Sequence, residues 1–231
     1  TDNLVSFFVN GRYYYDDGYL FGERRYQPDG TSGDNSVVSM NWRRNLYGQG
    51  NISISPFQDV KLNLEGLYSK EKYQDYDHSY RWNPDGNVTK YAESYNATAT
   101  LTHMLSSASF YTLKGSYFTK DFNEYTFENP FDSRYQHPDS LNIVSYAFRT
   151  KGTNLHRFYR QTNTFVGKLD FTSQFNTEHL VKLGAEVKSH NIKFDDYYLQ
   201  PEIVNGVETD PFKPSVPGID ETNRDIYDNN P

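Results

Sequence analysis

The chain has 231 residues, with 30 acidic and 23 basic side chains, a net charge of −7 and no cysteine. Its mean hydropathy is −0.86, but 17% of its residues are aromatic, which is not typical of a disordered segment. The acidic balance argues against a nucleic-acid partner, which needs a basic face. The lack of cysteine excludes disulfide scaffolds and cysteine-type zinc sites. No apolar run is long enough for a membrane helix, so we expect an ordered, tyrosine-rich chain without a helical anchor.

Apolar and polar residues alternate with a period of two along most of the chain, whereas helical periodicity is nearly absent. For example, Leu62 and Leu64 alternate with Lys61 and Glu65. The alternating stretches are residues 5–15, 42–55, 60–69, 95–105, 111–118, 164–171 and 181–188. The sequence therefore predicts seven β-strands, each with one apolar and one polar face.

The segments between the predicted strands alternate strictly between short and long. The short ones are residues 56–59, 106–109 and 173–178, and the long ones are residues 16–40, 71–90, 121–160 and the segment from 195 onward. In an up-and-down meander this alternation places every tight turn at one end of the sheet and every long loop at the other. Loops beyond about 12–15 residues are uncommon in compact domains. The pattern is typical of a transmembrane β-barrel.

Aromatic residues mark both ends of the predicted strands, as expected for rings at the two membrane interfaces. Near the long loops they are Tyr13, Tyr68, Tyr95, Tyr117 and Phe165, and near the short turns they are Phe7, Phe57, Tyr111 and Phe171. The polar strand face should then line the lumen, because a charge facing lipid costs roughly 2–4 kcal/mol at the midplane. The charged residues expected to face the lumen are Arg12, Lys61, Glu65, Lys114, Lys168, Asp170, Lys182, Glu186 and Lys188.

Seven strands cannot close a bacterial single-chain barrel, which has an even number of strands from eight upward. An unclosed sheet in lipid would leave unpaired backbone groups, each costing several kcal/mol. We therefore expect residues 1–231 to form one partial barrel domain of a larger protein.

Four stretches resemble the middle of the barrel of TonB-dependent outer-membrane receptors of the Bacteroidetes type, and the similarity runs from about residue 7 to residue 199. They are FYTLKGSYFTKDFNEYTFENPFDSRYQHP (110–138), DYDHSYRWNPDG (75–86), GTNLHRFYRQT (152–162) and HLVKLGAEVKSH (179–190).

The resemblance implies a 22-stranded barrel in the outer membrane of a Gram-negative cell, surrounded by outer-membrane lipid. It also implies a plug, a TonB-type energising protein that acts through the plug, and a surface lipoprotein as a further partner. The plug, the TonB box and the terminal strand are missing from this stretch. The implied function is binding and import of a nutrient such as a siderophore, cobalamin or an oligosaccharide.

The long loops mix aromatic and cationic side chains, which suits nutrient capture. Aromatic faces stack on sugars or macrocycles, and arginine binds carboxylate or phosphate through two parallel hydrogen bonds. Alternatively, the loop aromatics pack the extracellular loops against each other, and the arginines pair with anionic lipid head groups of the outer leaflet. The candidate ligand-binding residues are Tyr80, Arg81, Trp82, Arg134, Tyr135, Tyr146, Arg149, Arg157 and Tyr159.

The sequence indicates no enzyme and no resident cofactor, because its histidines are scattered and no catalytic motif is present. Asp75, Asp77 and Asp85 gather oxygen atoms that Ca²⁺ would accept, although the residues around Asp85 also form a typical turn sequence. Two other classes of function stay open at this point. One is a passive porin or adhesin-like barrel, and the other is a soluble β-sandwich that binds carbohydrate.

Overall fold

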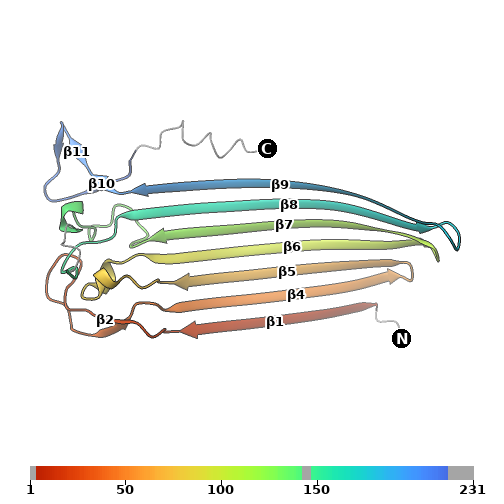
Figure 1. Cartoon of the computed structure of the whole chain (residues 1–231), viewed down its shortest axis with the longest axis horizontal. Coiled ribbons are helices and arrows are strands. Elements are labelled where there is room, and N and C mark those ends of the chain that lie inside the picture. Colours follow the sequence, from red (N-terminus) through yellow and green to blue (C-terminus); the bar gives the residue numbers. More distant parts are fainter. Residues whose placement is uncertain (1–3, 142–146, 218–231) are drawn as a thin grey trace.

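The computed structural model describes residues 4–141 and 147–217. Seven long strands form one sheet in chain order, and every neighbouring pair is antiparallel (Figure 1). They are β1 (Val5–Asp16), β4 (Arg43–Phe57), β5 (Val60–Tyr73), β6 (Thr89–Ser106), β7 (Ser109–Tyr125), β8 (His156–Gln174) and β9 (Leu180–Tyr198). The seven predicted strands and their up-and-down order are confirmed.

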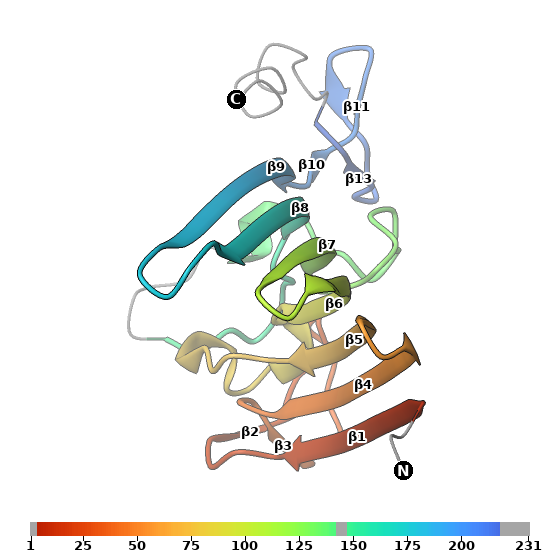
Figure 2. The same ribbon diagram turned by 90° about the vertical axis from the view of Figure 1, so that its right-hand side faces the viewer.

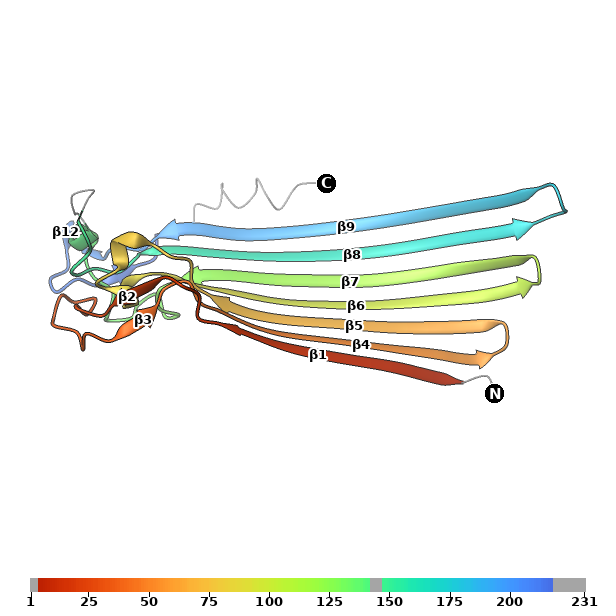
Figure 3. The same ribbon diagram turned by 60° about the horizontal axis from the view of Figure 1, so that its bottom comes forward.

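The sheet is curved and open. Figure 2 shows the strands as a curved row, with β1 and β9 at opposite ends. Within the described residues each of these two strands pairs with a single neighbour, β1 with β4 and β9 with β8. Figure 3 shows the strands running together from the turn end to the loop end of the sheet.

Three tight connections lie at one end of the sheet, as expected. Gln58 and Asp59 join β4 to β5, and Ser107 and Ala108 join β6 to β7. The third connection, between β8 and β9, is residues 175–179. There the side-chain oxygen of Asn176 accepts hydrogen bonds from two backbone N–H groups of its own turn, as asparagine commonly does.

The strands are longer at the loop end than the apolar pattern predicts. Backbone pairing continues in β8 from His156, whereas we expected the strand to begin near residue 164. The intervening side chains are mostly polar, but the hydrogen-bonded ladder does not depend on apolar alternation. Arg157 and Tyr159 therefore lie in a strand, and their predicted position in a long loop was wrong.

The long connections, residues 17–42, 74–88, 126–141 and 147–155, form a layer at the loop end together with residues 199–217. Its short elements are β2 (Phe21–Glu23), β3 (Val37–Ser39), η1 (His78–Tyr80), η2 (Pro84–Gly86), η3 (Pro138–Leu141), β10 (Gln200–Pro201), β11 (Ile203–Val204), β12 (Val207–Glu208) and β13 (Pro214–Ser215). Most of the buried apolar side chains lie here, among them Met40, Tyr80, Tyr135, Leu155 and Leu199. A search of the described residues finds no helix that is long and apolar enough to cross a membrane.

The two faces of the sheet differ in chemistry. We call the face that carries Ile52, Leu64 and Ala99 in one register row the apolar face, and the opposite face the polar face. Many large side chains on the apolar face are exposed, from 40% for Leu64 to 78% for Phe7, whereas Leu62 and Leu101 are partly buried. The strand registers place all of the charged residues that we expect to face a lumen on the polar face.

Candidate functional site

The apolar face ends, on its loop side, at a row of tyrosines whose hydroxyls point toward the loops. Tyr68 and Tyr95 lie opposite each other, with their ring centroids 5.0 Å apart. Both hydroxyls donate to the carboxylate of Glu93, at 2.9 Å and 2.6 Å, and Glu93 lies two residues nearer the loops than Tyr95. Each ring therefore has its polar atom on the loop side, above the apolar rows.

On its turn side the apolar face has a second polar boundary. The rings of His103 and Tyr111 lie 5.3 Å apart, and Nδ1 of His103 is 3.2 Å from the Tyr111 hydroxyl. Nε2 of the same histidine lies 3.4 Å from the carboxylate of Asp59, in the tight turn between β4 and β5. The stretch 95–103 between the two boundaries is as long as the roughly 9–11 residues with which a tilted strand crosses a membrane.

The polar face carries ion pairs along its length. In its middle, Lys168 pairs with Asp170 at 2.9 Å and Lys188 pairs with Glu186 at 2.7 Å. Near the loops one ion pair joins β4 to β5, and three linked pairs cross from β6 to β9. They are Arg43–Glu71 (3.2 Å), and Lys90–Glu124 (3.6 Å), His156–Glu124 (3.4 Å) and His156–Asp196 (2.8 Å). Part of the charge on this face is therefore paired, whereas Arg12, Lys61, Lys114 and Lys182 form no ion pair among the described residues.

An aromatic patch interrupts these charges at the loop end of the polar face. We define it as Phe122, Phe158, Phe194 and Arg160, from β7, β8 and β9. The ring centroids of Phe122 and Phe158 are 5.8 Å apart, and those of Phe158 and Phe194 are 6.3 Å apart. The exposed guanidinium of Arg160 lies 5.5 Å from the Phe122 centroid. Among the described residues no carboxylate forms an ion pair with Arg160, so the patch offers apolar rings and one available cation.

Arg157 and Tyr135, two predicted ligand-binding residues, are completely or almost completely buried. Arg157 donates hydrogen bonds to the backbone carbonyls of Phe127 (2.7 Å) and Glu128 (2.6 Å), and to the hydroxyls of Tyr135 (2.9 Å) and Tyr159 (2.8 Å). The Tyr135 hydroxyl in turn donates to the carbonyl of Phe127. These side chains therefore anchor the loop of residues 126–155 to β8.

Four other predicted residues also make contacts between loops. The Arg149 guanidinium stacks 4.8 Å from the ring of Tyr80, and burial raises the pKa of Tyr80 to about 12. The Trp82 ring packs 4.6 Å from Phe148 and 4.8 Å from the Arg25 guanidinium. Arg81 is exposed and presents its backbone carbonyl to the N–H of Glu23. Tyr146 lies outside the described residues.

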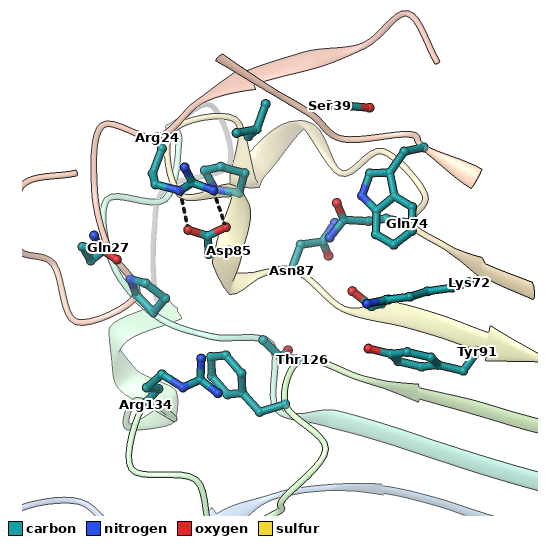
Figure 4. A pocket seen from close by; sticks show the side chains of 16 residues that line it. Arg24, Gln27, Ser39, Lys72, Gln74, Asp85, Asn87, Tyr91, Thr126 and Arg134 are labelled. Atoms are coloured by element: carbon teal, nitrogen blue, oxygen red, sulfur yellow. Dashed lines mark hydrogen bonds and ion pairs between the residues drawn. The ribbon is translucent and has the colours of Figure 1, made fainter. Parts of the chain in front are cut away.

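A cavity of about 500 Å³ lies where the loops meet the loop end of the sheet (Figure 4). Its sheet side includes Trp42, Lys72 and Tyr91, which continue the apolar face past the tyrosine row. Lys72 lies opposite Tyr91, with its ammonium 5.3 Å from the Tyr91 centroid and 5.7 Å from that of Trp42. Figure 4 shows the Lys72 and Tyr91 side chains side by side.

The loop side of this cavity is held by arginine–carboxylate pairs. Arg24 binds Asp85 through two hydrogen bonds, at 2.6 Å and 3.1 Å, and this contact raises the pKa of Arg24. Arg134, the one predicted ligand-binding residue in the lining, pairs with Asp132 at 2.8 Å and stacks 3.9 Å from the Phe127 ring. Hydrogen bonds from Arg134 also lower the pKa of Asp132. Both arginines are therefore paired with a carboxylate, whereas Lys72 has no ion pair among the described residues.

The three predicted calcium ligands point to three different partners. Asp75 pairs with Lys90 at 2.7 Å, Asp77 accepts a hydrogen bond from the N–H of Ser79, and Asp85 pairs with Arg24. Within the described part of the chain, no three histidine or acidic side chains are grouped as metal ligands.

Two features of the site were missed by the sequence reasoning. Lys72 was assigned to the loop of residues 71–90 and Tyr91 to neither a loop nor a strand, although the strand that carries Leu64, Gly66 and Tyr68 on one face continues past residue 72. Phe122 and Phe194 were likewise missed, because the strand assignments stopped at the last clear apolar alternation. Continuing the period of two beyond the aromatic row would have found both.

Comparison with protein-family models finds no match, and comparisons with curated proteins and with solved structures find none either.

Proposed function

We propose that this chain is a membrane-spanning part of an outer-membrane β-barrel, with its apolar face toward lipid and its polar face toward the lumen. The main support is the exposed apolar face, which has a polar boundary at each end. The hydroxyls of Tyr68 and Tyr95 form the boundary on the loop side, and the Tyr111–His103 pair forms the one on the turn side. Amphipathic rings occupy such positions at membrane interfaces. An exposed apolar surface of this extent marks an interaction or membrane surface.

The oblique course of the tyrosine row supports the same proposal. Tyr13 lies opposite Leu46, which in turn lies opposite Lys70, two residues nearer the loops than Tyr68. Tyr117 lies opposite Ala97, two residues nearer the turns than Tyr95. The row therefore steps across the registers from one edge of the sheet to the other. Strands of transmembrane barrels are tilted, so a row parallel to the membrane must cross their registers obliquely.

The alternative of a soluble β-sandwich fits the arrangement less well. A sandwich packs the apolar faces of two sheets against each other. Here the seven long strands belong to one sheet, and the other sheets in the described residues are two-stranded.

Within this membrane class we favour a TonB-dependent nutrient receptor over a passive porin. The observation that favours capture is the aromatic patch, where exposed Arg160 lies over Phe122 and Phe158. Such a surface suits a ligand with a ring or sugar face and an acidic group, because aromatic rings stack and arginine binds carboxylate. Siderophores, cobalamin and oligosaccharides remain the proposed nutrient classes, and import would use a TonB-type protein.

Cysteine accessibility tests the membrane orientation, because residues 1–231 hold no cysteine, and any cysteine elsewhere in the full-length protein would first be replaced by serine. We expect Leu64→Cys, in cells that produce the full-length protein, to react with a lipid-soluble maleimide but not with a charged one. Glu65→Cys, on the opposite face of the same strand, should react with the charged reagent through the lumen. Equal labelling of both positions by the charged maleimide would refute the orientation.

Growth tests the receptor function. A deletion strain would be complemented with the wild-type gene or with Phe158→Ala, on limiting iron, limiting cobalamin or single polysaccharides. We expect the wild type to restore growth in one of these conditions and the variant to restore it poorly at low nutrient concentration. Growth that does not depend on the gene in any condition would favour the porin or adhesin class.

A further inference from the structure

We propose that the cavity beside Lys72 and a hollow in the apolar face below it together bind one membrane lipid, with its phosphate at Lys72. This inference rests on the proposed membrane orientation. It concerns the outer surface of the sheet, whereas nutrient capture is assigned to the opposite face.

The cationic end of this lipid site is the ammonium group of Lys72. It lies between Trp42 and Tyr91 and also faces a second cavity, of about 440 Å³, toward Arg44. Arg44 is held by Asp17 at 2.6 Å, so it is already neutralised. Lys72 is the lining cation without an ion pair in the described structure, and a phosphate would supply its missing counter-charge.

The apolar end is a hollow of about 650 Å³ in the apolar face. Its floor is formed by small residues on neighbouring strands, including Gly66, Ala97, Ala99 and Gly115. An added Cβ at Gly66 or at Gly115 would meet no atom within 4 Å, so the floor is open. Larger side chains such as Leu64 flank this floor. The space between them has room for an acyl chain.

The two ends lie on the same face of the same two strands. Lys72 and Gly66 are on β5, while Tyr91 and Ala97 lie opposite them on β6. Six residues of strand separate Lys72 from Gly66, or about 20 Å along the strand at about 3.3 Å per residue, and about 15 Å of depth for a strand tilted by about 40°. Half of a bilayer with its headgroups is about 20 Å thick, so Gly66 would lie within the acyl chains of the same leaflet. A lipid with its phosphate at Lys72 would therefore lay its acyl chains over the hollow.

Lipid retention by the purified full-length protein in detergent, measured by native mass spectrometry, tests the site. Three probes separate its parts: phosphatidylglycerol, a diacylglycerol with the same chains, and inorganic phosphate. We expect phosphatidylglycerol to be retained and both partial probes to bind at least tenfold more weakly. Lys72→Gln should weaken phosphatidylglycerol binding roughly tenfold, since it removes one charge-assisted contact. Gly66→Leu, whose Cβ would meet no atom within 4 Å, would occupy the hollow and should weaken binding as well.

Lys114→Gln, which removes a cation from the polar face of the neighbouring strand β7, is the matched control and should leave lipid retention unchanged. Equal retention by the wild type and Lys72→Gln would overturn the proposal, as would an equal loss in the control. Inorganic phosphate that binds as tightly as the lipid and displaces it would show an ion site instead. A protein that stays soluble without detergent would refute the proposed membrane function itself, whereas a membrane-inserted protein that retains no lipid would refute the lipid site alone.

Discussion

Both faces of the sheet carry an available cation near the loops, but its surroundings differ. On the polar face Arg160 lies over phenylalanine rings, near linked ion pairs that run from Lys90 to Asp196. On the apolar face Lys72 lies between Trp42 and Tyr91, above a tyrosine row and an apolar hollow. One face therefore resembles the wet mouth of a lumen and the other resembles a membrane interface. The same combination of a cation and aromatic rings therefore suits different ligands on the two faces, because the neighbouring residues are charged on one face and apolar on the other.

The largest effect should come from placing a charge on the apolar face. Leu64 lies midway along β5 between Tyr68 and the turn, so in the proposed orientation Leu64→Arg would place a guanidinium in lipid at a cost of about 2–4 kcal/mol. We expect this variant to fail in assembly, as measured by the amount of protein in the outer-membrane fraction. Lys61→Ala, on the polar face of the same strand, should assemble normally. If both variants assembled equally well, the proposal that the apolar face contacts lipid and the polar face does not would be wrong.

The next largest effect should come from the buried arginine that anchors the loop layer. Arg157→Ala would leave the carbonyl of Glu128 without this donor and the carbonyl of Phe127 with the Tyr135 hydroxyl alone. It would also remove a completely buried side chain, so opening of the loop should become easier by about 2–5 kcal/mol. We expect faster cleavage within residues 126–155 in limited proteolysis, while assembly of the sheet persists.

Arg157→Lys is the control for charge in that experiment, because lysine keeps the positive charge but cannot make the forked set of bonds. It should be cleaved almost as fast as Arg157→Ala. If cleavage of either variant matched that of the wild type, Arg157 would not be an anchor, and its earlier assignment to ligand binding would regain weight.

The sequence predicted the sheet well because the sheet depends on local alternation. Strand identity, strand order and the positions of tight turns follow from a period of two and from short polar links, such as Gln58 and Asp59. The strand ends were predicted too short, since the apolar signal stops at the tyrosine row whereas backbone pairing continues.

The candidate site was predicted less well, because a loop layer depends on contacts between distant segments. Arg157, Tyr135 and Tyr80 look like ligand-binding side chains in the sequence, yet each is buried in the structure. Nothing local shows that the guanidinium of Arg157 finds two carbonyls about thirty residues earlier in the chain. Lys72 could have been found by extending the strand period, but its place between Trp42 and Tyr91 needs the strand register.

A double comparison sharpens the contrast between the two cations. Arg160→Ala should weaken nutrient binding roughly tenfold, since it removes a charge-assisted contact at the lumen mouth, and should leave lipid retention unchanged. Lys72→Gln should do the reverse. Ligand titration and native mass spectrometry on the same preparations measure both effects. A single variant that lowered both would mean that the two faces are coupled through the sheet.

The smallest effect should come from the hydroxyl groups of the tyrosine row. Tyr95→Phe removes one of the two donors to Glu93 but keeps the ring, and Tyr68 remains as the other donor. We expect normal assembly and a slightly lower thermal midpoint in bilayers, with a smaller change than in Tyr95→Leu, which removes the ring as well. This order follows because the ring supplies most of the apolar contact and the hydroxyl supplies its orientation at the interface. If Tyr95→Phe were as unstable as Tyr95→Leu, the hydrogen bond to Glu93 would be the main stabilising contact, and the row would be a polar network with no role as a membrane boundary.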